Sequence, residues 1–318
     1  MSNNQLAFVF PGQGSQSVGM LAKLAQLSPV VRATFDEASR VLGYDLWQLC
    51  QHGPVEDLNS TERTQPAMLA AGIATWRLWQ ERQGATPAVV TGHSLGEFSA
   101  LVAAGAIDFT TCVELVRFRG QVMQEAVPAG TGAMAALLGL EDADAEAACA
   151  EAAAAGGVVE AVNFNSQGQV VIAGERAAVL RAIDIAKAKG AKRAIELPVS
   201  VPAHSSLMHA AGARLGERLA KTEIRQPRIR YVSAVDARTH SDPGDLRLLL
   251  VSQLSSPVRW TNTVASLTAG SHVKTIVECG PGQVLLSLVK RIERRRDTQV
   301  FALEDPDSFA AASSAAAA

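Results

Sequence analysis

A serine in a glycine-rich turn is the residue of this sequence best placed for nucleophilic chemistry. Ser94 is the centre of G-H-S-L-G at 92–96, after the run A-V-V-T and before an Ala-rich segment with helical spacing. A strand, a sharp turn and a helix in this order form a nucleophile elbow, which presents the serine hydroxyl at the carboxyl end of a sheet. The pattern predicts acyl transfer through a serine ester. The alternative is a chance G-x-S-x-G in a Gly-rich chain, with Ser94 only capping a helix.

A serine nucleophile needs a base, and a histidine is the usual one. The chain has six histidines, at positions 52, 93, 204, 209, 240 and 272. Most stand in polar turns or beside loop signals, His209 lies off the apolar stripe of its predicted helix, and His93 is expected to point away from Ser94. His204, in V-S-V-P-A-H-S-S, lies where two predicted domains meet. It is therefore the candidate base, the alternative being a histidine at a helix start with no catalytic role.

Arg119 is unusual because it falls inside an apolar stripe. The predicted helix at 110–126 carries Leu115, Phe118, Val122 and Met123 on one face, and a helical wheel places Arg119 on that face and Arg117 on the opposite one. A guanidinium that points into a core needs an anion, and its planar fork suits a carboxylate. That anion is either an internal Asp or Glu or a carboxylate on the acyl group of the substrate.

The turn P-G-Q-G-S-Q at 11–16 follows a short apolar strand, Leu6 to Phe10. It does not fit the dinucleotide fingerprint, because Ser17 stands where G-x-G-x-x-G requires its third glycine. We expect its backbone to supply one N–H group of an oxyanion hole and Leu95 to supply the other. No P-loop or metal-ligand spacing occurs. Cys279, in E-C-G-P-G, is expected to be a buried structural thiol rather than a nucleophile.

The elements that position these residues alternate in a way that predicts an α/β protein with an inserted domain. Strand and helix signals open the chain and resume after Pro202, whereas residues from 133 to 199 follow the order β-α-β-β-α-β of a ferredoxin-like unit. We predict a parallel-sheet, α/β-hydrolase-like core with a small ferredoxin-like domain inserted into it, and a ligand site between the two. The predicted ranges are 1–127 and 200–304 for the core, 128–199 for the insert, and 305–318 for an Ala/Ser-rich tail that we expect to be disordered.

Composition excludes several classes of protein. Of 318 residues, 48% are hydrophobic and 19% charged, and the net charge of -2 does not favour nucleic-acid binding. The four cysteines show neither zinc spacing nor the density of a secreted scaffold, and no signal peptide or apolar run of about 20 residues is present. A cytoplasmic protein without a membrane segment is expected.

Several motifs together resemble one enzyme family. F-V-F-P-G-Q-G-S-Q, T-G-H-S-L-G-E, V-P-A-H-S, L-S-S-P-V-R-W and E-C-G-P-G occur in order between about residues 6 and 303. In this the chain is similar to the malonyl-CoA:acyl-carrier-protein transacylases. The resemblance implies an acyltransferase that moves malonyl from malonyl-CoA to the phosphopantetheine thiol of acyl carrier protein in fatty acid biosynthesis, with no metal or bound cofactor.

The same resemblance implies roles for individual residues. Ser94 corresponds to the nucleophile, His204 to its base and Arg119 to the residue that binds the malonyl carboxylate. Gln13 and Leu95 would supply the oxyanion-hole N–H groups, and the backbone carbonyl of Gln253 would orient the histidine.

Partners and alternatives follow from this interpretation. An acidic carrier protein would find its nearest basic cluster at Lys187, Lys189, Lys192 and Arg193, which is equally well explained as a solvated helix end. A malonyl-loading subunit of a polyketide or malonate decarboxylase system is the main alternative. A simple esterase would leave Arg119 without purpose, and a non-catalytic module that binds carrier protein would not acylate Ser94.

Overall fold

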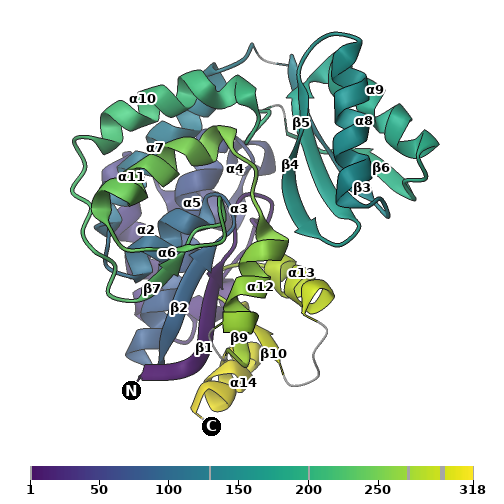
Figure 1. The fold of residues 1–318 in the computed structure, drawn as a ribbon. Helices are drawn as coiled ribbons and strands as arrows, with labels where there is room; N and C mark the ends of the chain where they lie inside the picture. Colours follow the sequence, from purple (N-terminus) through teal and green to yellow (C-terminus); the bar gives the residue numbers. More distant parts are fainter. Residues whose placement is uncertain (1, 129, 200, 271–272, 294–297, 318) are drawn as a thin grey trace.

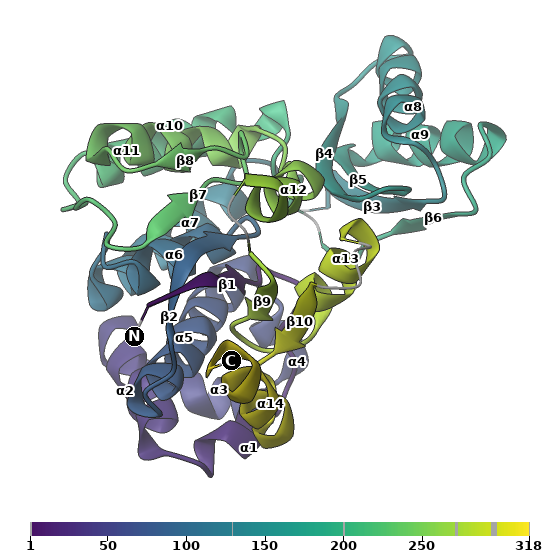
Figure 2. The same ribbon diagram turned by 60° about the horizontal axis from the view of Figure 1, so that its bottom comes forward.

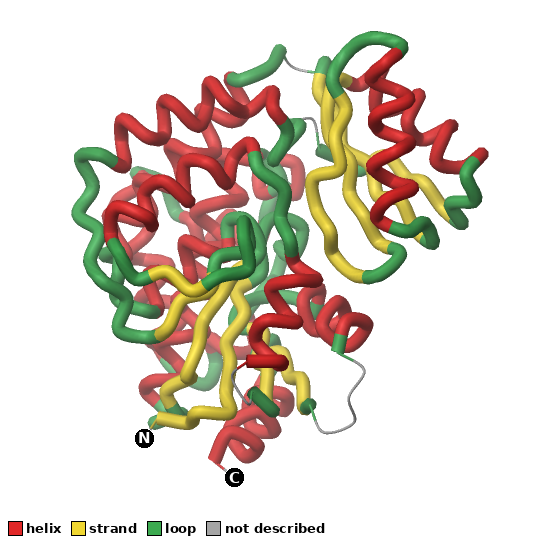
Figure 3. Tube along the Cα trace, viewed as in Figure 1, coloured by secondary structure: helices red, strands yellow, loops and turns green. Residues whose placement is uncertain are grey.

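The structure is a computed structural model that describes residues 2–128, 130–199, 201–270, 273–293 and 298–317. It contains two separate sheets, one of six strands and one of four. Figure 1 shows the four-stranded sheet and its two helices beside a larger body, and Figure 3, with all strands in yellow, shows the two sheets in separate parts of the molecule.

The large sheet has the strand order β10-β9-β1-β2-β7-β8. Every pairing from β10 to β7 is parallel, and β8 joins the edge antiparallel. Parallel strands require crossover helices and are buried on both faces, as predicted for the core. The strands are β1 (Ser2–Phe10), β2 (Thr86–Gly92), β7 (Arg230–Val232), β8 (Thr239–His240), β9 (Thr275–Glu278) and β10 (Gln299–Ala302).

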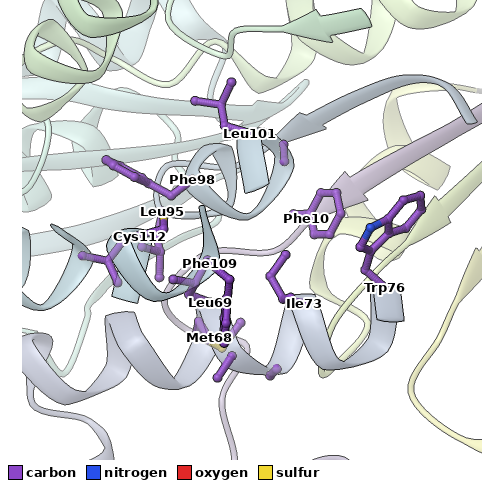
Figure 4. Close-up of a cluster of buried hydrophobic side chains, with 14 of the residues drawn as sticks. Phe10, Met68, Leu69, Ile73, Trp76, Leu95, Phe98, Leu101, Phe109 and Cys112 are labelled. Carbon is purple, nitrogen blue, oxygen red and sulfur yellow. The ribbon is translucent and has the colours of Figure 1, made fainter. Parts of the chain in front are cut away.

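Alternation along β1 divides the core into two layers. Leu6, Phe8 and Phe10 point to one face of the sheet, and Ala7 and Val9 point to the other; all five are fully buried. On the first face, Figure 4 shows Phe10 among side chains of the helices on either side of the nucleophile turn. This packing holds the nucleophile turn at residues 92–96 against the large sheet.

Helices cover both faces of the large sheet (Figure 2). The Phe10 face is covered by α2 (Pro29–Leu42), α3 (Leu46–His52), α5 (Thr61–Glu81), α6 (Gly96–Ala103), α7 (Phe109–Glu125), α10 (His209–Leu219) and α11 (Pro243–Ser252). The Val9 face is covered by α12 (Trp260–Gly270) and α13 (Val284–Ile292). The short helices are α1 (Ala22–Ala25), α4 (Val55–Leu58), η1 (Ser206–Met208) and η2 (Gln253–Ser255).

The small sheet has the antiparallel order β4-β5-β3-β6, which is that of a ferredoxin-like unit. One face packs on two helices, and the opposite face presents Met134, Val162, Val171 and Ala173. We call this unit the small subdomain; its elements are β3 (Gly132–Leu138), α8 (Asp142–Ala154), β4 (Val159–Ser166), β5 (Gln169–Glu175), α9 (Arg176–Ala188) and β6 (Arg193–Glu196). The exact division of the chain at 127/128 and 199/200 stays a prediction.

The expectation of a disordered tail from residue 305 is wrong. Residues Pro306–Ala317 form helix α14, with Phe309, Ala312 and Ala316 buried. The Phe309 ring packs edge-on against Trp79 at 5.7 Å, and the Asn3 side chain donates to the Ala316 carbonyl at 2.8 Å. Ala is the best helix former, so the segment forms a helix that docks through one aromatic ring, two buried alanines and one hydrogen bond, although its composition alone suggests disorder.

No helix within the described ranges is both long and apolar enough to cross a lipid bilayer.

Candidate active site

Ser94 occupies the predicted elbow between β2 and α6. Its φ of 53° lies in the left-handed region, which non-glycine residues rarely adopt. The glycines on either side make the turn possible: a Cβ on Gly92 would lie 1.9 Å from the Gly96 carbonyl carbon, and one on Gly96 would lie 2.0 Å from the Phe10 carbonyl oxygen. The strain and the close approach hold the hydroxyl clear of the helix that follows.

His204 lies against Ser94 although 110 residues separate them in the chain. Its Nε2 is 2.7 Å from Ser94 Oγ, and its Nδ1 is 2.7 Å from the Gln253 carbonyl oxygen. A carbonyl only accepts, so Nδ1 carries the proton and Nε2 of the neutral ring is left to accept from the serine. No carboxylate of the described residues is hydrogen bonded to this ring, which makes a serine–histidine pair oriented by a backbone carbonyl.

Burial keeps His204 neutral. The side chain is 4% exposed, and desolvation followed by repulsion from Arg119 lowers its pKa from 6.5 to about 3. A neutral imidazole at physiological pH is the form that can remove a proton.

Arg119 is buried beside the pair, as the helical wheel predicts, while Arg117 is exposed. Its Nη1 donates to Gln65 Oε1 at 2.8 Å, its Nη2 donates to Gln253 Oε1 at 2.9 Å, and the same Nη2 lies 3.4 Å from Ser94 Oγ. Its Nε–H has no partner, and no acid of the described chain forms an ion pair with it. Burial lowers its pKa to about 10, so it stays cationic at neutral pH. An ion pair between Arg119 and an internal Asp or Glu was one of the two alternatives from the sequence, and it does not occur among the described residues.

Two backbone amides belong to residues that line the space beside Ser94. Gln13 and Leu95 both line the cavity above Ser94, and within the described chain neither backbone N–H has a hydrogen-bond partner. The turn that carries Gln13 lies close to the elbow, since a Cβ on Gly12 would be 2.5 Å from the His93 carbonyl oxygen. The pair is available to receive an oxyanion.

Sequence reasoning missed two buried polar residues of the site. Gln65 of α5 holds one arm of Arg119, and Glu97 of α6 contacts the side-chain amide of Gln253. Glu97 is the one charged residue of an otherwise mostly apolar helix, which is a signal in the sequence, whereas Gln65 follows the polar run T-E-R-T and nothing local distinguishes it.

The other histidines lie away from Ser94 Oγ. His93 is 2.8 Å from Asn165 Oδ1 of β4, so it links the elbow to the small subdomain. His209 and His52 are exposed, and His240 pairs with Asp236 at 2.9 Å. His272 lies outside the described residues.

A cavity of about 460 Å³ joins these groups, and both parts of the molecule line it. The core contributes Gln13, Ser94, Arg119 and His204, and the small subdomain contributes Met134, Asn163 and Val171 with residues 197–199 after β6. A cleft is therefore present between the two units, where the sequence predicts a ligand site.

Two further groups lie elsewhere. The basic cluster at 187–193 does not line the cavity, and Lys187 and Lys189 pair with Asp184 and Glu151 at 3.7 and 3.4 Å. Cys279 is fully buried with a pKa raised well above its usual value by burial, and its Sγ–H donates to the Gly72 carbonyl at 3.6 Å, in keeping with a structural thiol. Among the described residues no three His, Cys, Asp or Glu side chains form a group that could hold a metal.

Comparison with known proteins agrees with this geometry. Residues 7–303 match the family described as acyl transferase domain. The chain is 54% identical over 309 residues to the malonyl CoA-acyl carrier protein transacylase of Escherichia coli K12, covering 97% of this chain and 98% of that protein.

Solved structures agree as well. A malonyl-CoA:acyl carrier protein transacylase from Xanthomonas oryzae pv. oryzae superposes with a TM-score of 0.96 at 51% identity, covering 99% of both chains. A malonyl-transacylase solved in complex with a type II PKS acyl-carrier protein gives 0.95 at 51% identity, covering 98% of this chain and 99% of that one. The predicted fold class is confirmed, and the protein belongs to the malonyl-CoA:acyl carrier protein transacylase family of acyltransferases.

Proposed function

We propose that the protein transfers malonyl from malonyl-CoA to the phosphopantetheine thiol of an acyl carrier protein through an ester on Ser94. One observation carries the proposal: a buried guanidinium, which forms no ion pair with any described carboxylate, lies 3.4 Å from a serine hydroxyl that is itself 2.7 Å from a neutral histidine. That arrangement suits an acyl group that carries its own carboxylate.

The first half-reaction acylates the serine. Ser94 Oγ attacks the thioester carbonyl while its proton moves to His204 Nε2, and the Gln13 and Leu95 N–H groups receive the negative oxygen of the tetrahedral intermediate. The C–S bond then breaks, and His204 returns the proton to the departing CoA thiolate.

The second half-reaction uses the same groups in reverse. The phosphopantetheine thiol loses its proton to His204 and attacks the ester carbonyl, and Ser94 leaves and recovers that proton. Gln253 holds the imidazole tautomer through both halves, since its carbonyl fixes the proton on Nδ1. Every step is assigned to residues of this chain, so we propose that no cofactor takes part.

Arg119 supplies selectivity in this scheme. A malonyl carboxylate would pair with the guanidinium, whereas an acetyl group would leave the cation buried and unpaired, at a cost of about 1–3 kcal/mol.

Two pathways could use this reaction, and they differ in the carrier protein that receives the malonyl group. Fatty acid synthesis is the first candidate, and one similar enzyme, solved in complex with a type II PKS acyl-carrier protein, favours polyketide loading as the second. Initial transfer rates to a fatty-acid and a polyketide carrier protein would separate them. Docking at the cluster from Lys187 to Arg193 stays a prediction, as does a cytoplasmic location, which the four free cysteines support.

Intact-protein mass spectrometry tests the proposal. Incubation with malonyl-CoA should add one malonyl group, the adduct should disappear on addition of holo carrier protein, and Ser94→Ala should show neither event. Binding of carrier protein with no adduct on the unmutated chain would favour a non-catalytic module, and rapid hydrolysis of uncharged esters would favour an esterase.

A further inference from the structure

Glu97 is a buried carboxylate for which the proposed reaction has no use. It follows Ser94 by three residues, in the first turn of α6, and is 1% exposed. Burial raises its pKa, while hydrogen bonds from Tyr231, Gln253, Ala234 and Ser233 oppose that rise. A carboxylate so close to the nucleophile and so fully enclosed needs a reason, because desolvation makes it costly.

Its two oxygens face different parts of the molecule. Oε1 accepts from Tyr231 Oη at 2.6 Å, from Ser233 Oγ at 2.8 Å and from the Ala234 backbone N–H at 2.8 Å. Oε2 accepts from Gln253 Nε2. One oxygen is therefore anchored to β7 and the residues after it, and the other faces the active site.

The Gln253 side chain lies between Glu97 and Arg119. Its Nε2 also donates to the Ser94 carbonyl oxygen at 2.9 Å, and its Oε1 accepts from Arg119 Nη2 at 2.9 Å. A carboxylate can only accept and a guanidinium can only donate, so only one of the two orientations of this amide satisfies both neighbours. Glu97 and the Ser94 carbonyl together thereby fix which atom Gln253 presents to Arg119.

We propose that Glu97 is a positioning residue: by fixing the amide orientation of Gln253, it holds the Arg119 guanidinium in the place where it receives the acyl carboxylate. The inference rests on the proposed function, in which Arg119 binds that carboxylate.

Glu97→Gln is the sharpest test, because it keeps the shape and the acceptor for β7 but turns a donor toward Gln253. Gln253 Nε2 then meets an N–H group in place of an oxygen, so the amide shifts or rotates and its hydrogen bond with Arg119 Nη2 is weakened or lost. We expect kcat/KM for malonyl-CoA to fall about tenfold or more, mainly through KM, while the slow acylation by acetyl-CoA changes less than about threefold.

Two further variants separate positioning from a merely structural role. Tyr231→Phe removes one donor from Oε1 and leaves Gln253 untouched, so it should lower the midpoint of thermal unfolding without changing the ratio of malonyl to acetyl rates. In the Arg119→Ala background, Glu97→Gln should have almost no additional effect on that ratio, because its effect passes through Arg119.

If Glu97→Gln does not fold, Gln253→Met provides a second test. It removes the same link and keeps the backbone carbonyl that orients His204, so it should show the same selective loss for malonyl-CoA. Equal losses for both donors, or a full additional loss in the Arg119→Ala background, would overturn the role of Glu97. Absence of a malonyl adduct on the unmutated chain would instead overturn the proposed function.

Discussion

The two walls of the cavity differ in chemistry. The core wall carries the hydroxyl, imidazole and guanidinium of Ser94, His204 and Arg119, each held by hydrogen bonds from other parts of the core. The wall of the small subdomain is mostly apolar, with Met134 and Val171 on the open face of its sheet.

This difference indicates that the two walls have different functions. Groups that bear charge or exchange protons must be fixed to within a fraction of an ångström, and they stand on a parallel sheet packed on both faces. The apolar wall excludes water from the ester, which strengthens the electrostatic interactions opposite it. Changes in the core wall should therefore alter chemistry and selectivity, and changes in the other wall should alter only affinity and leakage to water.

Arg119→Ala should have the largest effect on donor choice. Removal of the guanidinium should reduce kcat/KM for malonyl-CoA about 100-fold and leave acylation by acetyl-CoA unchanged or faster, because no unpaired cation remains. Rates of adduct formation with the two donors, measured by intact mass, give the ratio. Arg117→Ala, on the exposed face of the same helix, is the matched control and should leave the ratio unchanged.

The pH dependence of the core wall should be unusual for a histidine base. With the His204 pKa near 3 in place of 6.5, kcat/KM should stay level from pH 7 to pH 5. Arg119→Ala should move the acid limb to higher pH, since repulsion from Arg119 is the second cause of the depression. A limb centred near 6.5 in the unmutated enzyme would contradict this account.

The same shift predicts a sign for stability. The unfolded chain binds a proton on this histidine below pH 6.5 and the folded one does not, so the free energy of unfolding should fall as pH decreases from 6.5 toward 3. Urea denaturation of the parent and of His204→Gln at pH 7 and pH 5 measures the difference, which should be smaller in the variant.

Asn165→Ala should have a moderate effect, because it removes the hydrogen bond between His93 and the small subdomain. Loss of an acceptor for a partly buried N–H should lower the free energy of unfolding by about 1 kcal/mol. We expect KM to rise a few-fold for malonyl-CoA and acetyl-CoA alike. A change in the ratio of the two donors would show that this contact does more than join the walls.

Val171→Ala should have the smallest effect. It enlarges the cavity by two methyl groups on the apolar wall, where Val171 is 6% exposed. The ratio of donors should stay within about twofold of the parent, and hydrolysis of the malonyl adduct in the absence of carrier protein should increase modestly. A loss of donor selectivity as large as that of Arg119→Ala would contradict the claim that only the core wall determines selectivity.

The sequence was sufficient to predict the parts of the site that depend on local geometry. The elbow at Ser94 needs a strand, a turn and two small residues, and all are readable within ten positions. The buried position of Arg119 follows from one helical period. The position of His204 could not be predicted from local geometry alone. It also required the prediction that the inserted domain ends, and the core resumes, just before this residue.

Contacts between distant segments were not predictable. Glu97 accepts hydrogen bonds from Tyr231 and Gln253 across 134 and 156 positions, and no local pattern signals which donors a buried glutamate will find. The prediction that the tail is disordered failed for a related reason. The Ala/Ser-rich composition gives no sign of a core, but the Phe309 ring packs against Trp79, more than 200 positions earlier in the chain.

A crystal structure of the malonylated enzyme tests the central claim most directly. We predict malonyl on Ser94 Oγ, its free carboxylate within hydrogen-bond distance of the Arg119 guanidinium, and its ester carbonyl oxygen near the Gln13 and Leu95 backbone N–H groups. A malonyl carboxylate that points to solvent or to the small subdomain, with Arg119 still held only by Gln65 and Gln253, would contradict it.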